Sequence, residues 1–202
     1  MIDLIGFAAA VLIVELTPGP NMAWLVTLTM SEGRRAGLAA AAGVTAGLAA
    51  NAAVSVLAAS LVLKTDGPLG RGMSLLAAAM MIWLAWDAWK GSADTSQFER
   101  AGRGGRHALA GFVLNLFNPK AALFLVAVMP QFVAGGRPTV TQGLIFGAIS
   151  VTIATTIHLA LVLGAEHARG TLMAEARARM VRRVLAIAML GVAAWFLTKA
   201  FG

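Results

Sequence analysis

The chain lacks cysteine and has few charged residues: none of its 202 residues is Cys, and only 12% are Asp, Glu, Lys or Arg. The absence of cysteine excludes disulfides, thiol chemistry and Cys-containing metal sites. The charged fraction lies well below the roughly 25% of ordinary soluble domains. Hydrophobic residues make up 59% of the chain, and the mean hydropathy is +0.80. The composition therefore predicts a membrane protein rather than a water-soluble one.

The few charges that are present are mostly positive, with a formal net charge of +7 and a pI near 11.3. A basic protein can bind nucleic acid by neutralising phosphates. Here most of the Lys and Arg lie in short segments between apolar tracts, where such residues orient membrane insertion. We therefore expect a lipid bilayer as the partner of this chain, and no nucleic acid.

Six apolar tracts each approach the roughly 20 residues that cross a bilayer core as a helix. An acid, Asp3, stands where a signal peptide has basic residues, so the first tract is expected to be a retained span. The sequence predicts an all-α membrane protein with six transmembrane helices. The expected helices are at about 4–30, 36–63, 68–90, 108–133, 139–164 and 181–201.

Basic residues distinguish the two sides of the membrane. The side that carries fewer of them holds Lys64, Arg71, Arg137 and Lys199. The connectors after spans one, three and five hold Arg34, Arg35, Lys90, Arg100, Arg103, Arg106, Arg169, Arg177, Arg179, Arg182 and Arg183. Because cytoplasmic loops are enriched in Lys and Arg, we expect these connectors in the cytoplasm and both termini outside.

A shift of about 100 residues overlays features of the two halves of the chain. The matched residues are Pro18 and Pro119, Gly43 and Gly143, and Gly47 and Gly147. Three spans per unit is an odd number, so the second unit must enter the membrane inverted. We predict one domain over 1–202, with repeat one at about 1–90, a cytoplasmic connector at about 91–107 and repeat two at about 108–202. The glycines are interpreted as sites of close helix packing.

The first helix of the first repeat is interrupted about midway by the run Thr17-Pro18-Gly19-Pro20-Asn21. The two prolines remove amide donors, so the carbonyls of Val14 and Leu16 are expected to lose their usual helical partners four residues away. A helix that restarts after such a break directs free N–H groups and partial positive charge at the gap, while the preceding helix offers carbonyls. The two ends suit the carboxylate and the ammonium group of an amino acid. Pro18, Gly19, Pro20 and Asn21 are therefore candidate substrate-binding residues.

The corresponding interruption of the second repeat is Asn115-Leu116-Phe117-Asn118-Pro119-Lys120. We expect Pro119 to free the carbonyl of Asn115, Asn118 to donate and accept hydrogen bonds, and Lys120 to bring a charge deep into the membrane. Such charges are costly and normally have a function and a partner, for which Glu15 is our candidate. The alternative is that Lys120 extends to the cytoplasmic interface and Glu15 faces water near the other surface. Asn115, Asn118, Pro119 and Lys120 complete the predicted substrate site.

Other polar and aromatic residues lie in apolar surroundings. Asn51 and His158 are further polar candidates; His158 could relay a proton or make an interhelical hydrogen bond. Glu15 and His158 are the candidates for proton coupling. Asp87 is expected to reach the interface. The stripe Trp83, Trp86 and Trp89 fits interfacial anchoring better than an aromatic substrate cage.

Taken together, the motifs resemble the LysE/RhtB family of amino acid exporters. The resemblance rests on Pro18-Gly19-Pro20-Asn21, the Glu32-Gly33-Arg34-Arg35-Ala36-Gly37 connector, Gly43-Val44-Thr45-Ala46-Gly47, Asn115 to Ala121, Pro130-Gln131-Phe132 and the arginine-rich lead into the last span. It implies a multi-pass protein of the bacterial inner membrane that exports homoserine, threonine, leucine or lysine, driven by the proton motive force. Members often carry an acid directly after the second Gly of span two, where this chain has Leu48. The coupling residue and the substrate type therefore stay open.

Three other functions were weighed against the exporter. One is export of another small zwitterionic or cationic metabolite. An intramembrane enzyme would need a catalytic motif, but His107, His158 and His167 lie in separate segments and no His-Glu-x-x-His or Gly-x-Ser-x-Gly is present. A passive structural subunit would not need two breaks in the membrane. We expect no enzyme activity, no catalytic residues, no metal and no cofactor, and the sequence leaves open whether the chain forms a homo-oligomer.

Overall fold

The computed structural model describes residues 2–62, 68–90, 106–136, 138–165 and 175–201, and nearly all of them are helical. An isolated antiparallel bridge joins Ile2 to Val133. The elements in chain order are α1 (Leu4–Glu15), α2 (Pro20–Glu32), α3 (Arg34–Val62), α4 (Pro68–Lys90), α6 (His107–Leu116), α7 (Pro119–Leu123), the π-helical turn η2 (Phe124–Val128), the 3-10 turn η3 (Met129–Phe132), α8 (Val140–Leu163) and α10 (Glu175–Phe201). The prediction of an all-α protein is confirmed.

Three continuous stretches are long and apolar enough to cross a membrane: Arg34–Ala59, Val140–Leu163 and Arg179–Thr198. Two further candidates are bent pairs, α1 with α2 at 57° and α6 with the segment Pro119–Phe132 at 40°. The part of the chain that the structure describes therefore holds three to five candidate spans, without α4. The interruptions lie where the prolines predicted them, whereas six spans arranged as inverted repeats stay a prediction.

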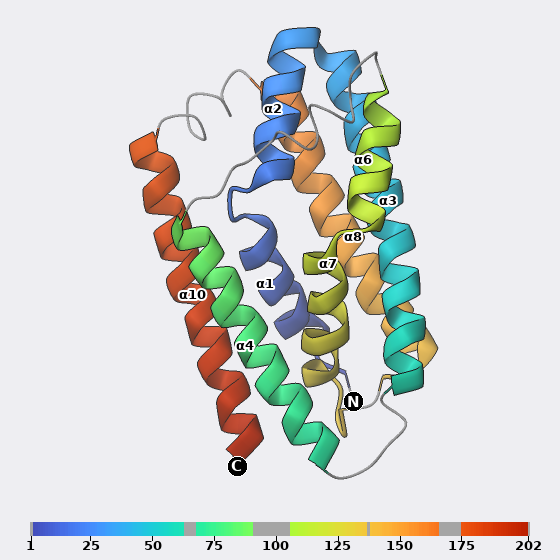
Figure 1. Ribbon diagram of the computed structural model, residues 1–202, viewed down its shortest axis with the longest axis vertical. Helices are drawn as coiled ribbons and strands as arrows, with labels where there is room; N and C mark the ends of the chain where they lie inside the picture. Colours follow the sequence, from blue (N-terminus) through green and yellow to red (C-terminus); the bar gives the residue numbers. More distant parts are fainter. Residues whose placement is uncertain (1, 63–67, 91–105, 137, 166–174, 202) are drawn as a thin grey trace.

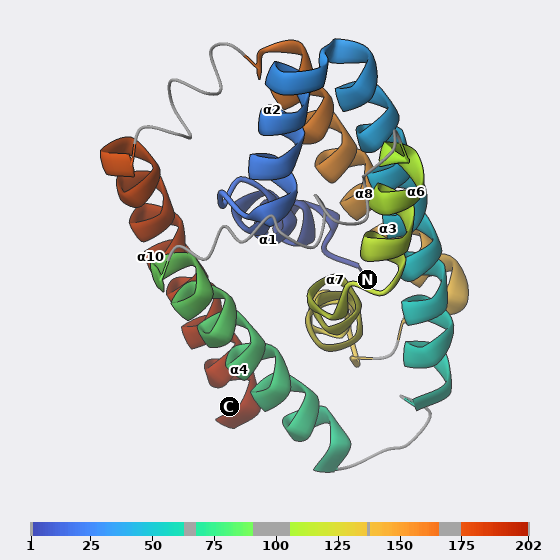
Figure 2. The ribbon, with the colours of Figure 1, turned by 45° about the horizontal axis from the view of Figure 1, so that its top comes forward.

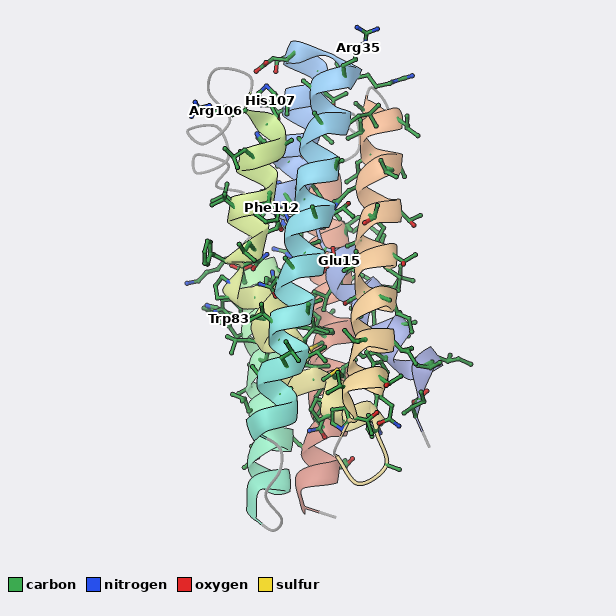
Figure 3. The ribbon with its side chains drawn as sticks, turned by 90° about the vertical axis from the view of Figure 1, so that its right-hand side faces the viewer. Glu15, Arg35, Trp83, Arg106, His107 and Phe112 are labelled. Carbon is green, nitrogen blue, oxygen red and sulfur yellow. The ribbon has the colours of Figure 1, made fainter. Side chains whose placement is uncertain are left out.

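The ends of the helices form two groups, at opposite ends of the molecule (Figure 1). One group, which we call the basic end, combines the end of α2, the start of α3 and the starts of α6 and α10, whereas α4 ends nearer mid-height. Figure 3 shows Arg35 and Arg106 there. The start of α1 and the end of α10 lie at the opposite, terminal end. Five of the basic residues used to predict the orientation, Lys64, Arg100, Arg103, Arg137 and Arg169, lie outside the described residues.

Glycine allows α3 to pack closely between α6 and α8. A Cβ atom on Gly43 would meet the backbone of Ala108, and one on Gly47 would meet the carbonyl oxygen of Phe112. Gly143 of α8 faces α3 from the other side. Because only hydrogen fits at these contacts, the interpretation of Gly43, Gly47 and Gly143 as packing residues is confirmed, whereas a Cβ on Gly147 would meet Ala52 at an ordinary 3.4 Å.

α4 and α10 form a pair that packs along its own length. The other main contacts of this pair are with α1, η2 and η3, which belong to the terminal half of the molecule. Figures 1 and 2 both show the α4–α10 pair standing apart from α2 at the basic end. The molecule is therefore joined more closely at its terminal end than at its basic end.

Aromatic rings fill the core of the terminal half. The ring centroid of Phe7 lies 4.6 Å from that of Phe146 and 5.6 Å from that of Phe132. Phe132 in turn lies 6.0 Å from Phe196, and Phe124 packs on Phe7 from the second interruption. These buried rings, which we call the aromatic core, close the terminal end and brace the ends of α1 and η3.

Candidate functional site

A cavity of about 470 Å³ lies between the two interruptions, within the range of roughly 300–1,000 Å³ that small-molecule sites occupy. Its walls come from both breaks and from α3, α4 and α8. Eight of the predicted site residues line it: Glu15, Gly19, Pro20, Asn21, Asn118, Pro119, Lys120 and His158. Pro18 and Asn115 are not part of the lining, although both belong to the breaks. Figure 3 shows Glu15 at mid-height, away from both ends of the molecule.

At the first break, α1 ends in a tightened turn. The N–H of Thr17 donates to the carbonyl of Val14 at 3.3 Å, and its Oγ1 donates to the carbonyl of Ile13 at 2.9 Å. The Val14 carbonyl thus loses its usual partner four residues away, as predicted, and a bond from the third residue replaces the one that Pro18 cannot make.

Beyond the first break, α2 starts without a capping side chain. Gly19 is its N-cap, Pro20 is its first helical residue, and no side chain caps it. The N–H groups of Asn21 and Met22 occupy the positions that such a cap would satisfy, and both residues line the cavity. This helix end therefore offers donors and partial positive charge to a ligand.

The second break repeats the turn of the first. The N–H of Asn118 donates to the carbonyl of Asn115 at 3.3 Å, so the expectation that Pro119 frees this carbonyl is wrong. Unlike α2, α7 is capped: Oδ1 of Asn118 accepts from the N–H groups of Lys120 and Ala121 at 3.0 and 3.3 Å. The two breaks thus have matching backbone turns, but only the first presents an uncapped helix end.

Two buried asparagines hold the breaks in place. Nδ2 of Asn51 donates to the carbonyls of Leu116 and Asn118 at 2.9 and 3.1 Å, on either side of the second kink. Asn115 joins the two breaks, since its Oδ1 accepts from Nδ2 of Asn21 at 2.9 Å. Polar groups without water must be satisfied by the protein itself, so these amides stabilise the interrupted helices in the membrane.

Replacing Asn51 by leucine is expected to destabilise the protein. The carbonyls of Leu116 and Asn118 would lose their partner, at about 1–3 kcal/mol for each buried group left unsatisfied. Thermal unfolding in detergent should show the loss. The control is the double variant with valine at Thr45 and Thr155. Their hydroxyls bond to each other at 2.9 Å, so replacing both leaves no polar group without a partner. An unchanged melting temperature for Asn51→Leu would contradict this role.

The charge at the second break is paired, although with a partner other than the expected one. Nζ of Lys120 lies 3.4 Å from Oδ2 of Asp87 on α4. Glu15 lines the same cavity but is not the observed ion-pair partner, and Asp87 faces the cavity instead of the interface. The sequence could not identify this pair because α4 is apolar around most of its circumference, which hides the face that points inward.

His158 brings a polar side chain from α8 to the cavity. It is only 2% exposed, and its Nδ1 has no hydrogen-bond partner in the described part of the chain. Trp83, Trp86 and Trp89, by contrast, are exposed and do not line the cavity. Cationic groups of Lys90 and Arg183 lie over the rings of Trp86 and Trp89. Their position outside the cavity does not fit a substrate cage, and anchoring at a membrane interface stays a prediction.

Similarity to known proteins extends over most of this chain. The family model described as LysE type translocator matches residues 12–200. The chain belongs to this family. A homoserine/homoserine lactone efflux protein of Salmonella typhimurium is 26% identical over 143 residues, which cover 70% of this chain and 69% of the relative. A threonine efflux protein of Escherichia coli K12 is 28% identical over 159 residues, covering 75% and 77%.

A further relative of this LysE-type chain is an uncharacterised membrane protein of Pseudomonas aeruginosa, 28% identical over 171 residues, which cover 80% of this chain and 78% of the relative. No solved structure matches the chain. The family is one of translocators rather than enzymes, and together with the apolar helices it supports a multi-pass membrane protein with a transport function.

Proposed function

We propose that this protein is a secondary transporter that exports an amino acid from the cytoplasm across the inner membrane. The observation that carries the proposal is the cavity between two interrupted helices, which offers groups of both charges. Lys120 and the uncapped start of α2 suit a carboxylate, and the carboxyl groups of Glu15 and Asp87 suit an ammonium group. A zwitterion is the ligand class that uses both.

The substrate is proposed to be of the homoserine or threonine type, with leucine and lysine as further members of the same class. Two relatives are named as efflux proteins for homoserine and threonine, and the cavity has room for a small amino acid with its water. The alternative, another small zwitterionic or cationic metabolite, would use the same charged groups.

Proton antiport is the proposed driving force, with Glu15 and His158 as candidate carriers. Both side chains line the cavity that holds the substrate, so a proton and a substrate can compete for one site. Leu48 stands directly after Gly47 of α3 and lines the cavity without a titratable group, so the carrier must lie elsewhere.

If the basic end is cytoplasmic, as the positive-inside rule indicates, substrate enters the cavity from that side. Export would follow when access to the cavity changes to the terminal end, in two halves that form inverted repeats of a single domain.

The experiment that tests this function loads cells with dipeptides that contain homoserine, threonine, leucine or lysine. Cells that carry the protein should release at least one of these amino acids several-fold faster than cells with an empty vector. A protonophore should abolish the difference if protons drive export. Equal release of all four with and without the protein would refute the proposed function.

A further inference from the structure

Asp87 connects the α4–α10 pair to the second interrupted helix across the cavity. It lies on α4, whose main partner is α10, whereas Lys120 lies at the second break. Their ion pair therefore joins the α4–α10 pair to the interrupted helix on the other side of the cavity. Among the described residues, no other charged side chain of α4 or α10 lines this cavity.

This ion pair is loose and accessible. The separation of 3.4 Å exceeds the roughly 2.7–2.9 Å of a strong charge-assisted hydrogen bond. The two side chains are 34% and 35% exposed, and both line the cavity. A ligand that enters the cavity can therefore contact both groups.

The charges that line the cavity are unbalanced. Lys120 is the basic side chain of the described lining, and it faces two carboxyl groups, those of Asp87 and Glu15; the remaining titratable group is His158. The lining therefore has two carboxyl groups but only one ammonium group, so a ligand that brings an ammonium group of its own can pair with the second carboxyl group. Asp87 is already next to Lys120, so a ligand whose opposite charges lie a few ångströms apart can bridge this pair.

We propose that Asp87 recognises the ammonium group of the substrate. The amino acid enters between the two side chains, with its ammonium on the Asp87 carboxylate and its carboxylate on Lys120 and the first-turn N–H groups of α2. This assignment rests on the proposed function and deepens it. Because Asp87 lies on the α4–α10 pair, a bound substrate takes the place of the direct ion pair and links Asp87 to Lys120 at the second break.

The test measures binding to the purified full-length protein in lipid nanodiscs, with three related probes. L-Threonine carries both charges, 3-hydroxybutyrate is threonine without its ammonium group, and 1-amino-2-propanol is threonine without its carboxylate. The wild type should bind threonine at least about 10-fold more tightly than either analogue. Asp87→Asn should lower the affinity for threonine about 10- to 100-fold but change the affinity for 3-hydroxybutyrate less than about 3-fold. The variant would then no longer prefer a ligand that carries the ammonium group.

Two variants serve as controls. Lys120→Gln should show the opposite pattern: the affinity for 3-hydroxybutyrate should fall, and the affinity for 1-amino-2-propanol should stay nearly unchanged. Asp3→Asn makes the same chemical change at the N-cap of α1, outside the cavity, and should leave the affinity for all three probes unaltered because asparagine caps as well as aspartate. If Asp87→Asn alone does not fold, the double variant with Lys120→Gln removes both charges together and should have lost the preference for threonine over 3-hydroxybutyrate.

The assignment is overturned if Asp87→Asn, or the double variant, keeps the wild-type preference for threonine over 3-hydroxybutyrate, or if Asp87→Asn weakens the two probes equally. These results leave the proposed function intact when the wild type still exports amino acids from dipeptide-loaded cells. A wild type that exports none of them, and binds none of the probes, overturns the proposed function and this assignment together.

Discussion

Replacing Lys120 by glutamine is expected to lower amino acid export about 30-fold or more. Lys120 is the basic side chain that the described lining offers to a substrate carboxylate, and it balances Asp87 at 3.4 Å. Glutamine keeps the length of the side chain but not its charge, so the substrate loses a partner and Asp87 is left uncompensated. The measurement is export from dipeptide-loaded cells, normalised to the amount of protein in the membrane.

The matched control is Lys90→Gln on α4. Lys90 lies over the ring of Trp86 and does not line the cavity. Its replacement should leave export within about twofold of the wild type, since exposed charges contribute little. Normal export per molecule for Lys120→Gln, with only its abundance reduced, would show that Lys120 has a structural role and no part in transport.

Replacing Gly43 by alanine is expected to have the largest effect on folding. The added Cβ would overlap the backbone of Ala108 on α6, and backbone atoms cannot rotate away as a flexible side chain can. Overpacking of this kind destabilises by about 1–3 kcal/mol and occasionally more. α6 would have to move away from α3, and with it Asn115 at the second break. Thermal unfolding in detergent and the monodisperse fraction on size exclusion report the effect.

Gly191 on α10 provides the matched control for this change. A Cβ atom at Gly191 would meet nothing within 4 Å, so Gly191→Ala changes the same atoms in open surroundings. It should be neutral or stabilise the helix by up to about 1 kcal/mol, the difference in helix propensity. Equal melting temperatures for Gly43→Ala and Gly191→Ala would contradict the close approach of α3 and α6.

Much of the fold could be predicted from local sequence features. Apolar tracts give the helices within a few residues, although α10 begins at Glu175 instead of the expected 181. Both breaks lie at the predicted prolines, because a missing N–H disrupts a helix whatever surrounds it. The carbonyl of Asn115, by contrast, is not free as expected, because the chain tightens there and the N–H of Asn118 donates to it.

The candidate site could be predicted only in part. Eight of the predicted residues line one cavity because the two breaks lie side by side at mid-height, which the repeat suggested. Asn51 was noted as polar, but its bonds to the carbonyls of Leu116 and Asn118 required the packing of α3 against the second break. The pairing of Lys120 with Asp87 instead of Glu15 could not be predicted, since two helices, α1 and α4, each bring a carboxyl group to the cavity.

The sequence by itself determined that this chain is helical and apolar, that two helices break at prolines and that glycines mark close contacts. Each of these properties follows from the covalent chemistry of a few neighbouring residues. Only the tertiary structure decided that α4 pairs with α10, that Asp87 faces Lys120 and that the uncapped start of α2 opens into the cavity. These contacts join residues far apart in the chain, and a helix that is apolar on most sides does not reveal which face its neighbours will cover.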